Sequence, residues 1–214
     1  MQDLVSQVRK EGMISTGIDL FLSAVLAVFK VIGLASGGMF LIVSGIFIAF
    51  ICFSVIYRLR ALRKISMLSG IKAAALYRNC VILCICFVAL LLFYPAGCYR
   101  EVTMKEMIEE TIWNLAVPAA AIYIIVAWLR INFSLARVSG VNIFRAYVWL
   151  CAFFFALNWL CGAGPFGLAT FKPQIGDSDA VLIIASLKEF LPFIALVITS
   201  IVHLLAWSKI EKLA

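Results

Sequence analysis

The chain has 214 residues, of which 65% are hydrophobic and only 14% are charged, and its mean hydropathy is +1.11. Soluble globular domains contain roughly 45–50% apolar and about 25% charged residues, so a water-soluble fold could not bury this much apolar surface. The net charge of +7 comes from basic residues in short stretches between apolar runs, not from one polar module. The composition predicts an integral membrane protein and argues against nucleic-acid binding.

Continuous apolar runs predict an all-α fold. In hydrocarbon every backbone amide needs an internal partner, and a helix supplies these partners within one segment. We expect a single transmembrane domain, a polytopic bundle of six transmembrane helices (alternatively five) with short loops. The expected spans cover about residues 13–32, 36–57, 80–97, 111–129, 146–163 and 190–207.

The number of spans depends on how residues 18–57 are divided, a stretch of 40 residues with only two charges. One straight helix of that length would be about 60 Å long, twice the roughly 30 Å hydrocarbon core. A hairpin that turns at Gly33, Gly37 and Gly38 fits better, because glycine permits the backbone reversal. The alternative is one tilted span over about residues 36–57, preceded by a segment in the membrane interface.

The distribution of charge predicts the orientation. Lys and Arg without any acid occur in the expected loops 58–79 and 130–145, whereas most acids lie in the expected loops 98–110 and 164–189. Because cytoplasmic loops carry the excess of Lys and Arg, the basic loops and the basic C-terminal tail are expected in the cytoplasm. This pattern suits a bacterial inner (plasma) membrane, with anionic lipid headgroups as partners of the basic loops.

Local signals predict where two of the helices begin. Thr103 and Glu106 have the spacing of a capping box, so a helix is expected to start there. Asp179 is the expected N-cap of a helix that continues into the last span. Pro118 is expected to kink the helix in which it lies.

Several polar side chains within the expected spans are candidates for an intramembrane function, because such groups are costly in hydrocarbon. They are Asp19, Lys30, Asn114, Asn158 and His203. Asp19 and Lys30 cannot pair directly, because eleven residues of helix separate them by about 16 Å. A lone histidine on an apolar face more often bonds a neighbouring helix than carries a proton.

Small residues and cysteines give further expectations. Helices can approach closely at small residues, which here are Gly33, Gly37, Gly38 and Gly45. Cys98 and Cys161 lie at the outer ends of two spans and form a candidate disulfide, whereas the other five cysteines are expected to pack as small hydrophobes. The tryptophans lie near span ends, as interfacial anchors do, at positions 113, 128, 149, 159 and 207.

No motif in the sequence indicates a catalytic, cofactor or metal site. The chain has one histidine and no C-x-x-C pair, so a zinc or redox site is not indicated, and we find no internal repeat. We therefore expect a non-enzymatic subunit or modulator of a larger membrane assembly of the secretion, transfer or respiratory type. Its partners would be other membrane subunits or a second copy. The alternatives are a small-molecule or ion transporter or channel and, with less support, an intramembrane enzyme.

Overall fold

The computed structural model describes residues 2–32, 39–93, 104–162 and 179–213, and all regular structure within them is helical. The helices are α1 (Gln2–Ile32), α2 (Met39–Ser69), α3 (Ala73–Phe93), α4 (Met104–Ser139), α5 (Ile143–Gly162) and α6 (Asp179–Ser208). Within the described residues, α1, α4 and α6 contain segments long and apolar enough to cross a membrane, and α3 and α5 contain shorter apolar segments. The expected all-helical membrane class is confirmed.

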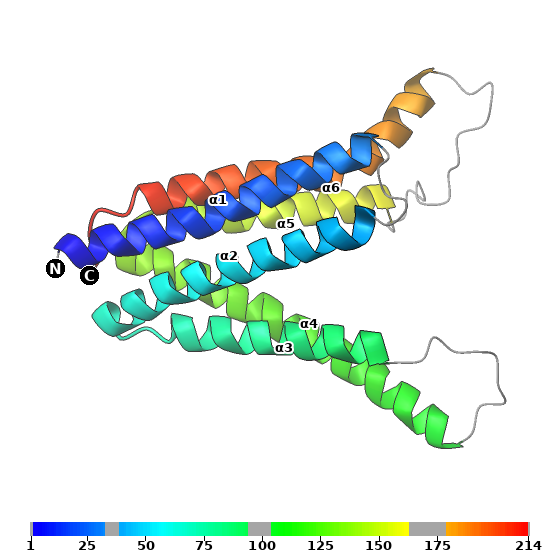
Figure 1. Cartoon of the computed structure of the whole chain (residues 1–214), viewed down its shortest axis with the longest axis horizontal. Helices are drawn as coiled ribbons and strands as arrows, with labels where there is room; N and C mark the ends of the chain where they lie inside the picture. The colour runs from blue at the N-terminus through cyan, green and yellow to red at the C-terminus, as the bar shows by residue number, and fades with distance from the viewer. Residues whose placement is uncertain (1, 33–38, 94–103, 163–178, 214) are drawn as a thin grey trace.

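The six helices form a ring. Each helix contacts the next one along the chain, and α6 returns to contact α1. The two ends of the chain therefore lie side by side at one end of the bundle (Figure 1), where α2 also turns into α3 and α4 into α5. We call this end the terminal end and the opposite one the far end.

Helices α1 and α2 lie antiparallel along much of their length. The rings of Phe21 and Phe50 are 5.5 Å apart between centroids, and those of Phe29 and Phe47 are 6.2 Å apart. This pairing shows that the chain reverses between α1 and α2, as the hairpin predicts. The glycines expected at the turn lie outside the described residues, and Gly45 lies within α2.

Two expected loops are largely helical, which corrects the sequence-based boundaries. Helix α2 continues through most of 58–79 to Ser69, and α4 continues through most of 130–145 to Ser139. Lysine and arginine are good helix formers, so a basic stretch does not by itself end a helix. Helices α4 and α6 are described from Met104 and Asp179 onward. The residues before them lie outside the described part of the chain, so the caps expected at Thr103 and Asp179 stay predictions.

The two short connections at the terminal end have the same geometry. Gly70 and Gly140 both have a φ of 69°, the left-handed conformation that ends a helix. The serine before each glycine donates its hydroxyl to the carbonyl four residues earlier, Ser69 to Ile65 at 2.7 Å and Ser139 to Leu135 at 2.6 Å. Glycine, not the basic charge, ends these helices.

These connections belong to an internal repeat that we did not find in the sequence alone. Residues 59–77 and 129–147 match at a constant spacing of 70. The identical pairs are Leu59/Leu129, Arg60/Arg130, Ser69/Ser139, Gly70/Gly140 and Tyr77/Tyr147. The end of α6 continues the pattern, because Ala206-Trp207-Ser208-Lys209-Ile210 resembles Ala127-Trp128-Leu129-Arg130-Ile131. The ring thus consists of three similar helix pairs, α2–α3, α4–α5 and α6–α1, and the chain ends occupy the position of the third turn.

Replacing Gly70 or Gly140 by alanine should destabilise the protein by about 1–2 kcal/mol at each position, because a Cβ disfavours the left-handed conformation. No other atom lies within 4 Å of a Cβ built at either position, so the loss reports backbone strain alone. Thermal unfolding in detergent measures the effect. Asparagine, which tolerates this conformation better, is the control and should cost less than alanine; equal losses would contradict the explanation.

The buried core lies at the terminal end. Fully or nearly fully buried side chains come from α1, α2, α4, α5, α6 and the segment after α6, and they include Val8, Leu62, Leu135, Phe144 and Ile210. Toward the far end the α3–α4 pair diverges from the other helices (Figure 1). Among the residues whose burial is described, the core shared by the helices therefore lies at the terminal end.

Candidate functional site

An ion pair between α1 and α2 is the most strongly polar contact of the described structure. The Arg58 guanidinium forms a salt bridge with Asp19, and the Ser54 hydroxyl donates to Asp19 Oδ1 at 2.5 Å. Ser54 and Arg58 are one helical turn apart, so both face α1. The side chains of Arg58 and Asp19 are only 21% and 31% exposed, and the pair is therefore shielded from full hydration.

A buried pair of serines extends this contact. The hydroxyl oxygens of Ser15 and Ser54 are 3.1 Å apart, and Ser54 is also 3.2 Å from the Ser15 carbonyl. A serine hydroxyl has one proton to donate. Ser54 donates it to the Asp19 carboxylate, because a charged acceptor forms the stronger hydrogen bond. Ser15 then donates to Ser54, which gives a short relay of hydroxyls that ends on Asp19.

A second group of side chains surrounds His203 on α6. Trp207 Nε1 donates to His203 Nε2 at 3.1 Å, and the Tyr147 ring stacks on the imidazole with 4.4 Å between centroids. Phe144 meets the Trp207 ring edge-on at 5.5 Å. A histidine nitrogen that accepts a hydrogen bond carries no proton, so the imidazole is neutral in this arrangement. The hydrogen bond of His203 therefore lies within α6, and its contact with α5 is the stacked Tyr147 ring and not the expected bond to a neighbouring helix.

The two groups meet inside the ring. The neutral phenols of Tyr77 on α3 and Tyr147 on α5 both lie near the Arg58 guanidinium. The Tyr147 ring also contacts Trp128 of α4, with 5.6 Å between centroids. All six helices thus contribute to what we call the polar centre, which consists of Ser15, Asp19, Ser54, Arg58, Tyr77, Trp128, Tyr147, His203 and Trp207.

The internal repeat explains part of this arrangement. Arg58 and Trp128 are equivalent in the 70-residue repeat, and Trp207 follows in the third helix pair. Each lies against the helix that pairs with its own, Arg58 near Tyr77 and Trp128 near Tyr147. Trp207 instead lies on Gly12, where a Cβ would overlap its indole ring.

Of the five candidate intramembrane residues, the structure brings Asp19 and His203 to the polar centre. Asn158 is exposed on α5 and does not reach it. Lys30 and Asn114 lie in α1 and α4, but their side chains are outside the described part of the structure, as are Cys98 and the side chain of Cys161. The candidate disulfide therefore stays a prediction.

Sequence reasoning missed Arg58 and Trp207. Arg58 was placed in a basic loop, although its spacing of four from Ser54 matches that of Asp19 from Ser15 and could have indicated two facing polar stripes. Trp207 was expected to be an interfacial anchor, but its side chain is 1% exposed, so that expectation is wrong. Both errors come from treating basic and aromatic residues near a span end as surface features.

A second ion pair continues the α1–α2 contact toward the terminal end. Lys64 Nζ lies 2.8 Å from Glu11 and 3.0 Å from the Gln7 amide oxygen. Some buried polar atoms have no hydrogen-bond partner among the described residues, namely Glu11 Oε2, Thr16 Oγ1, Arg58 Nε and Asn132 Oδ1.

Two further results bear on chemistry and ancestry. Among the described residues, no group of three or more His, Cys, Asp or Glu side chains is placed to hold a metal ion. Comparison with known proteins gives no matching family model, no matching curated protein and no matching solved structure.

Proposed function

We propose that this chain is a non-enzymatic, multi-pass membrane protein with six spans that serves as a subunit or modulator of a larger membrane assembly. The observation that supports this most is the contrast between the two ends of the ring. The terminal end has a shared buried core, whereas toward the far end large apolar side chains are exposed on several helices. Examples are Ile48 on α2, Ile85 on α3, Leu115 on α4 and Phe155 on α5.

Helix α5 has a broad exposed face in this half of the ring. Ala152, Phe153, Phe155 and Ala156 are all exposed, and at about 100° per residue these positions form one continuous apolar face about 160° wide. Helices associate in membranes by close packing. A helix of a partner subunit against α5 and the diverging α3–α4 pair would supply that packing.

The polar centre is consistent with such a role. Asp19 is satisfied by Arg58 and Ser54, and His203 is satisfied by Trp207. These groups mainly bond each other, so they hold helices together and leave the far half free for partners. This is what a scaffold subunit requires.

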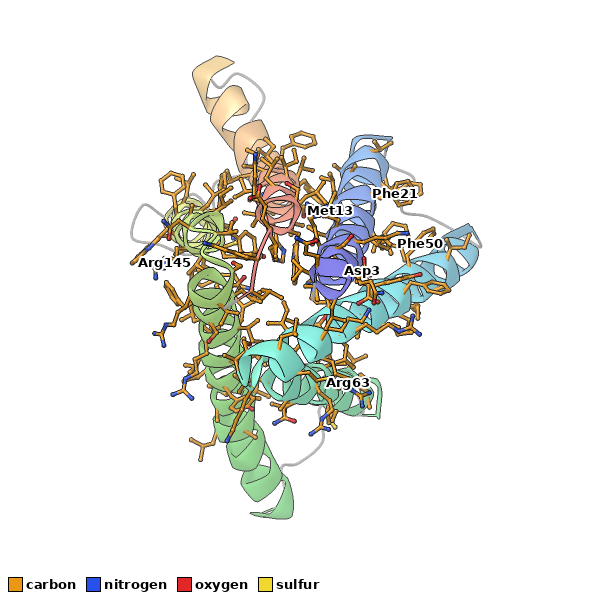
Figure 2. All side chains as sticks on the ribbon, turned by 90° about the vertical axis from the view of Figure 1, so that its left-hand side faces the viewer. Asp3, Met13, Phe21, Phe50, Arg63 and Arg145 are labelled. Atoms are coloured by element: carbon orange, nitrogen blue, oxygen red, sulfur yellow. The ribbon has the colours of Figure 1, made fainter. Side chains whose placement is uncertain are left out.

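We place the terminal end in the cytoplasm of a bacterial inner membrane. Figure 2 looks at this end and shows Arg63 and Arg145 pointing away from the ring. Both are exposed, and an outward arginine at this level can reach anionic lipid headgroups.

Photo-crosslinking in native membranes tests the proposal. A photoreactive amino acid at Phe155 should give one discrete protein adduct, and gentle purification should recover the same protein in a fixed ratio. Met67, which is 69% exposed but lies near the terminal end, is the matched control and should give no such adduct. Recovery of a lone chain with only lipid adducts at Phe155 would overturn the subunit role.

A transporter is the second candidate, because Thr16 Oγ1 and Arg58 Nε are buried near the polar centre without a hydrogen-bond partner among the described residues. Unsatisfied polar groups inside a membrane protein often mark a route for ions or solutes. The ion-pair variants described in the Discussion distinguish this candidate, because they would change transport where the protein still folds.

A further inference from the structure

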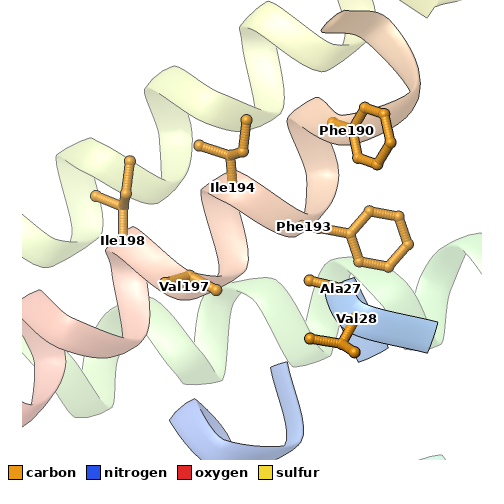
Figure 3. Close-up of a pocket in the computed structure, with 7 residues that line it drawn as sticks. All are labelled: Ala27, Val28, Phe190, Phe193, Ile194, Val197 and Ile198. Atoms are coloured by element: carbon orange, nitrogen blue, oxygen red, sulfur yellow. The ribbon is translucent and has the colours of Figure 1, made fainter. Parts of the chain in front are cut away.

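An apolar hollow of about 480 Å³ lies between α1 and α6 in the half of the ring toward the far end. The described residues that line it are Ala27, Val28, Phe190, Phe193, Ile194, Val197 and Ile198. Figure 3 shows the two phenylalanine rings on one side and Ala27 and Val28 facing them. Val28, Ile194 and Ile198 are also exposed at the outer surface, so the hollow is open to the surrounding hydrocarbon.

The two ends of the α1–α6 contact explain why the hollow exists. Toward the terminal end, Gly12 allows the indole of Trp207 to lie directly on the α1 backbone, which holds the helices close. Toward the far end, Pro192 lies within α6, and a proline inside a helix removes a backbone hydrogen bond and bends it. The first part of α6 leans away from the bundle in Figure 1, and the space between the helices widens accordingly.

The size and chemistry of the hollow restrict what can occupy it. Every lining side chain that the structure describes is hydrocarbon, which favours an apolar occupant, because a polar group without a hydrogen-bond partner is costly to bury. An α-helix with its side chains is about 10–12 Å across, so a hollow of this volume would take only about one turn. A single extended hydrocarbon chain is narrow enough to lie along the helices and fill it. The volume also falls within the range of small-molecule sites, about 300–1,000 Å³.

We propose that this hollow binds one acyl chain of a membrane phospholipid. The chain enters from the bilayer beside Val28 and Ile198 and packs against Phe190 and Phe193. Because bulk lipid is equally apolar, the preference comes from closer van der Waals packing against the two rings and not from removal of water. The site does not depend on the function proposed above, since it needs only that α1 and α6 lie in the membrane.

A phosphatidylcholine with a diazirine in its acyl chain, incorporated with the protein into nanodiscs, tests the site. In the unaltered protein, the labelled peptides should be those that contain Val28, Phe193 and Ile194, at least tenfold above the lipid-exposed segment around Ile85. Equal labelling of both segments would overturn the proposal. So would a cross-link from a photoreactive residue at Ile194 to another protein, because that result assigns the hollow to a partner.

A variant pair gives an independent measurement. Ala27→Trp fills the hollow and should reduce labelling of the α6 peptide at least tenfold. Ala152→Trp introduces the same side chain at an exposed position of α5 that does not line the hollow, and labelling should be unchanged. If Ala27→Trp elutes as a folded protein, unchanged labelling of the α6 peptide in this variant would overturn the proposal. If the variant does not fold, the labelling pattern of the unaltered protein decides between the outcomes.

Discussion

Replacing Gly12 by alanine should lower the free energy of unfolding by about 1–3 kcal/mol, the usual cost of overpacking a core. The added methyl group would overlap the indole ring of Trp207, whose side chain is 1% exposed and is held by Phe144 and His203. The ring has no free space into which it can move. We expect the loss to appear in detergent unfolding curves followed by tryptophan fluorescence.

Gly17 provides the matched control on the same helix. No atom lies within 4 Å of a Cβ built at Gly17, so Gly17→Ala should raise stability by about 0.5–1 kcal/mol, because alanine has the higher helix propensity. A smaller residue at the Trp207 position should also relieve Gly12→Ala, so the double variant Gly12→Ala/Trp207→Leu should lose less than the two single losses combined. Similar effects of alanine at Gly12 and Gly17 would show that α1 and α6 are not in close contact.

Neutralising only one partner of the Asp19–Arg58 pair should be more harmful than neutralising both. In Arg58→Gln the Asp19 carboxylate keeps only hydrogen bonds to neutral groups such as Ser54, in a site where it is 31% exposed. A charge left alone in a buried pair costs about 3–5 kcal/mol, and the partial exposure here reduces our expected loss to about 2–3 kcal/mol. Asp19→Asn should have a similar effect, because it leaves the positively charged Arg58 guanidinium without its carboxylate partner.

The double variant Asp19→Asn/Arg58→Gln completes the cycle and should recover at least half of the larger single loss. Arg63→Gln is the control for removal of a positive charge from α2, since Arg63 is exposed, and it should change stability by about 0.5 kcal/mol or less. Additive losses in the cycle would mean that the two groups do not interact. Liposomes that contain the double variant can be compared with liposomes that contain the unaltered protein. If the double variant folds normally but an ion flux seen with the unaltered protein is lost, that result favours the transporter function over the subunit function.

The all-helical membrane class could be predicted because it depends on local physics. A long apolar run requires a lipid environment and satisfies its backbone hydrogen bonds as a helix, whichever residues it packs against. The hairpin of α1 and α2 was predictable for a similar reason, since the apolar stretch was too long for one crossing. In each case neighbouring residues carry the information.

The polar centre could not be predicted, because its contacts join residues far apart in the sequence. Asp19 and Arg58 are 39 residues apart. The equal spacing of Ser15 from Asp19 and of Ser54 from Arg58 indicates a polar stripe on each helix, but it does not determine how the two helices pair. His203 was expected to bond a neighbouring helix, yet the stacking partner Tyr147 depends on how α5 is rotated. The repeat, by contrast, was present in the sequence, but five matches scattered over two helices become recognisable only when both glycine turns are seen to have the same φ.

The contact between α6 and α1 also constrains the order in which the protein can be assembled. The ribosome releases α1 first, yet the surface around Gly12 is covered only when Trp207 arrives with the last helix. Until then the nascent chain is an open arc of helices with its α1 face uncovered. Closure of the ring therefore requires α6, because a chain truncated before this helix would leave the α1 surface around Gly12 uncovered.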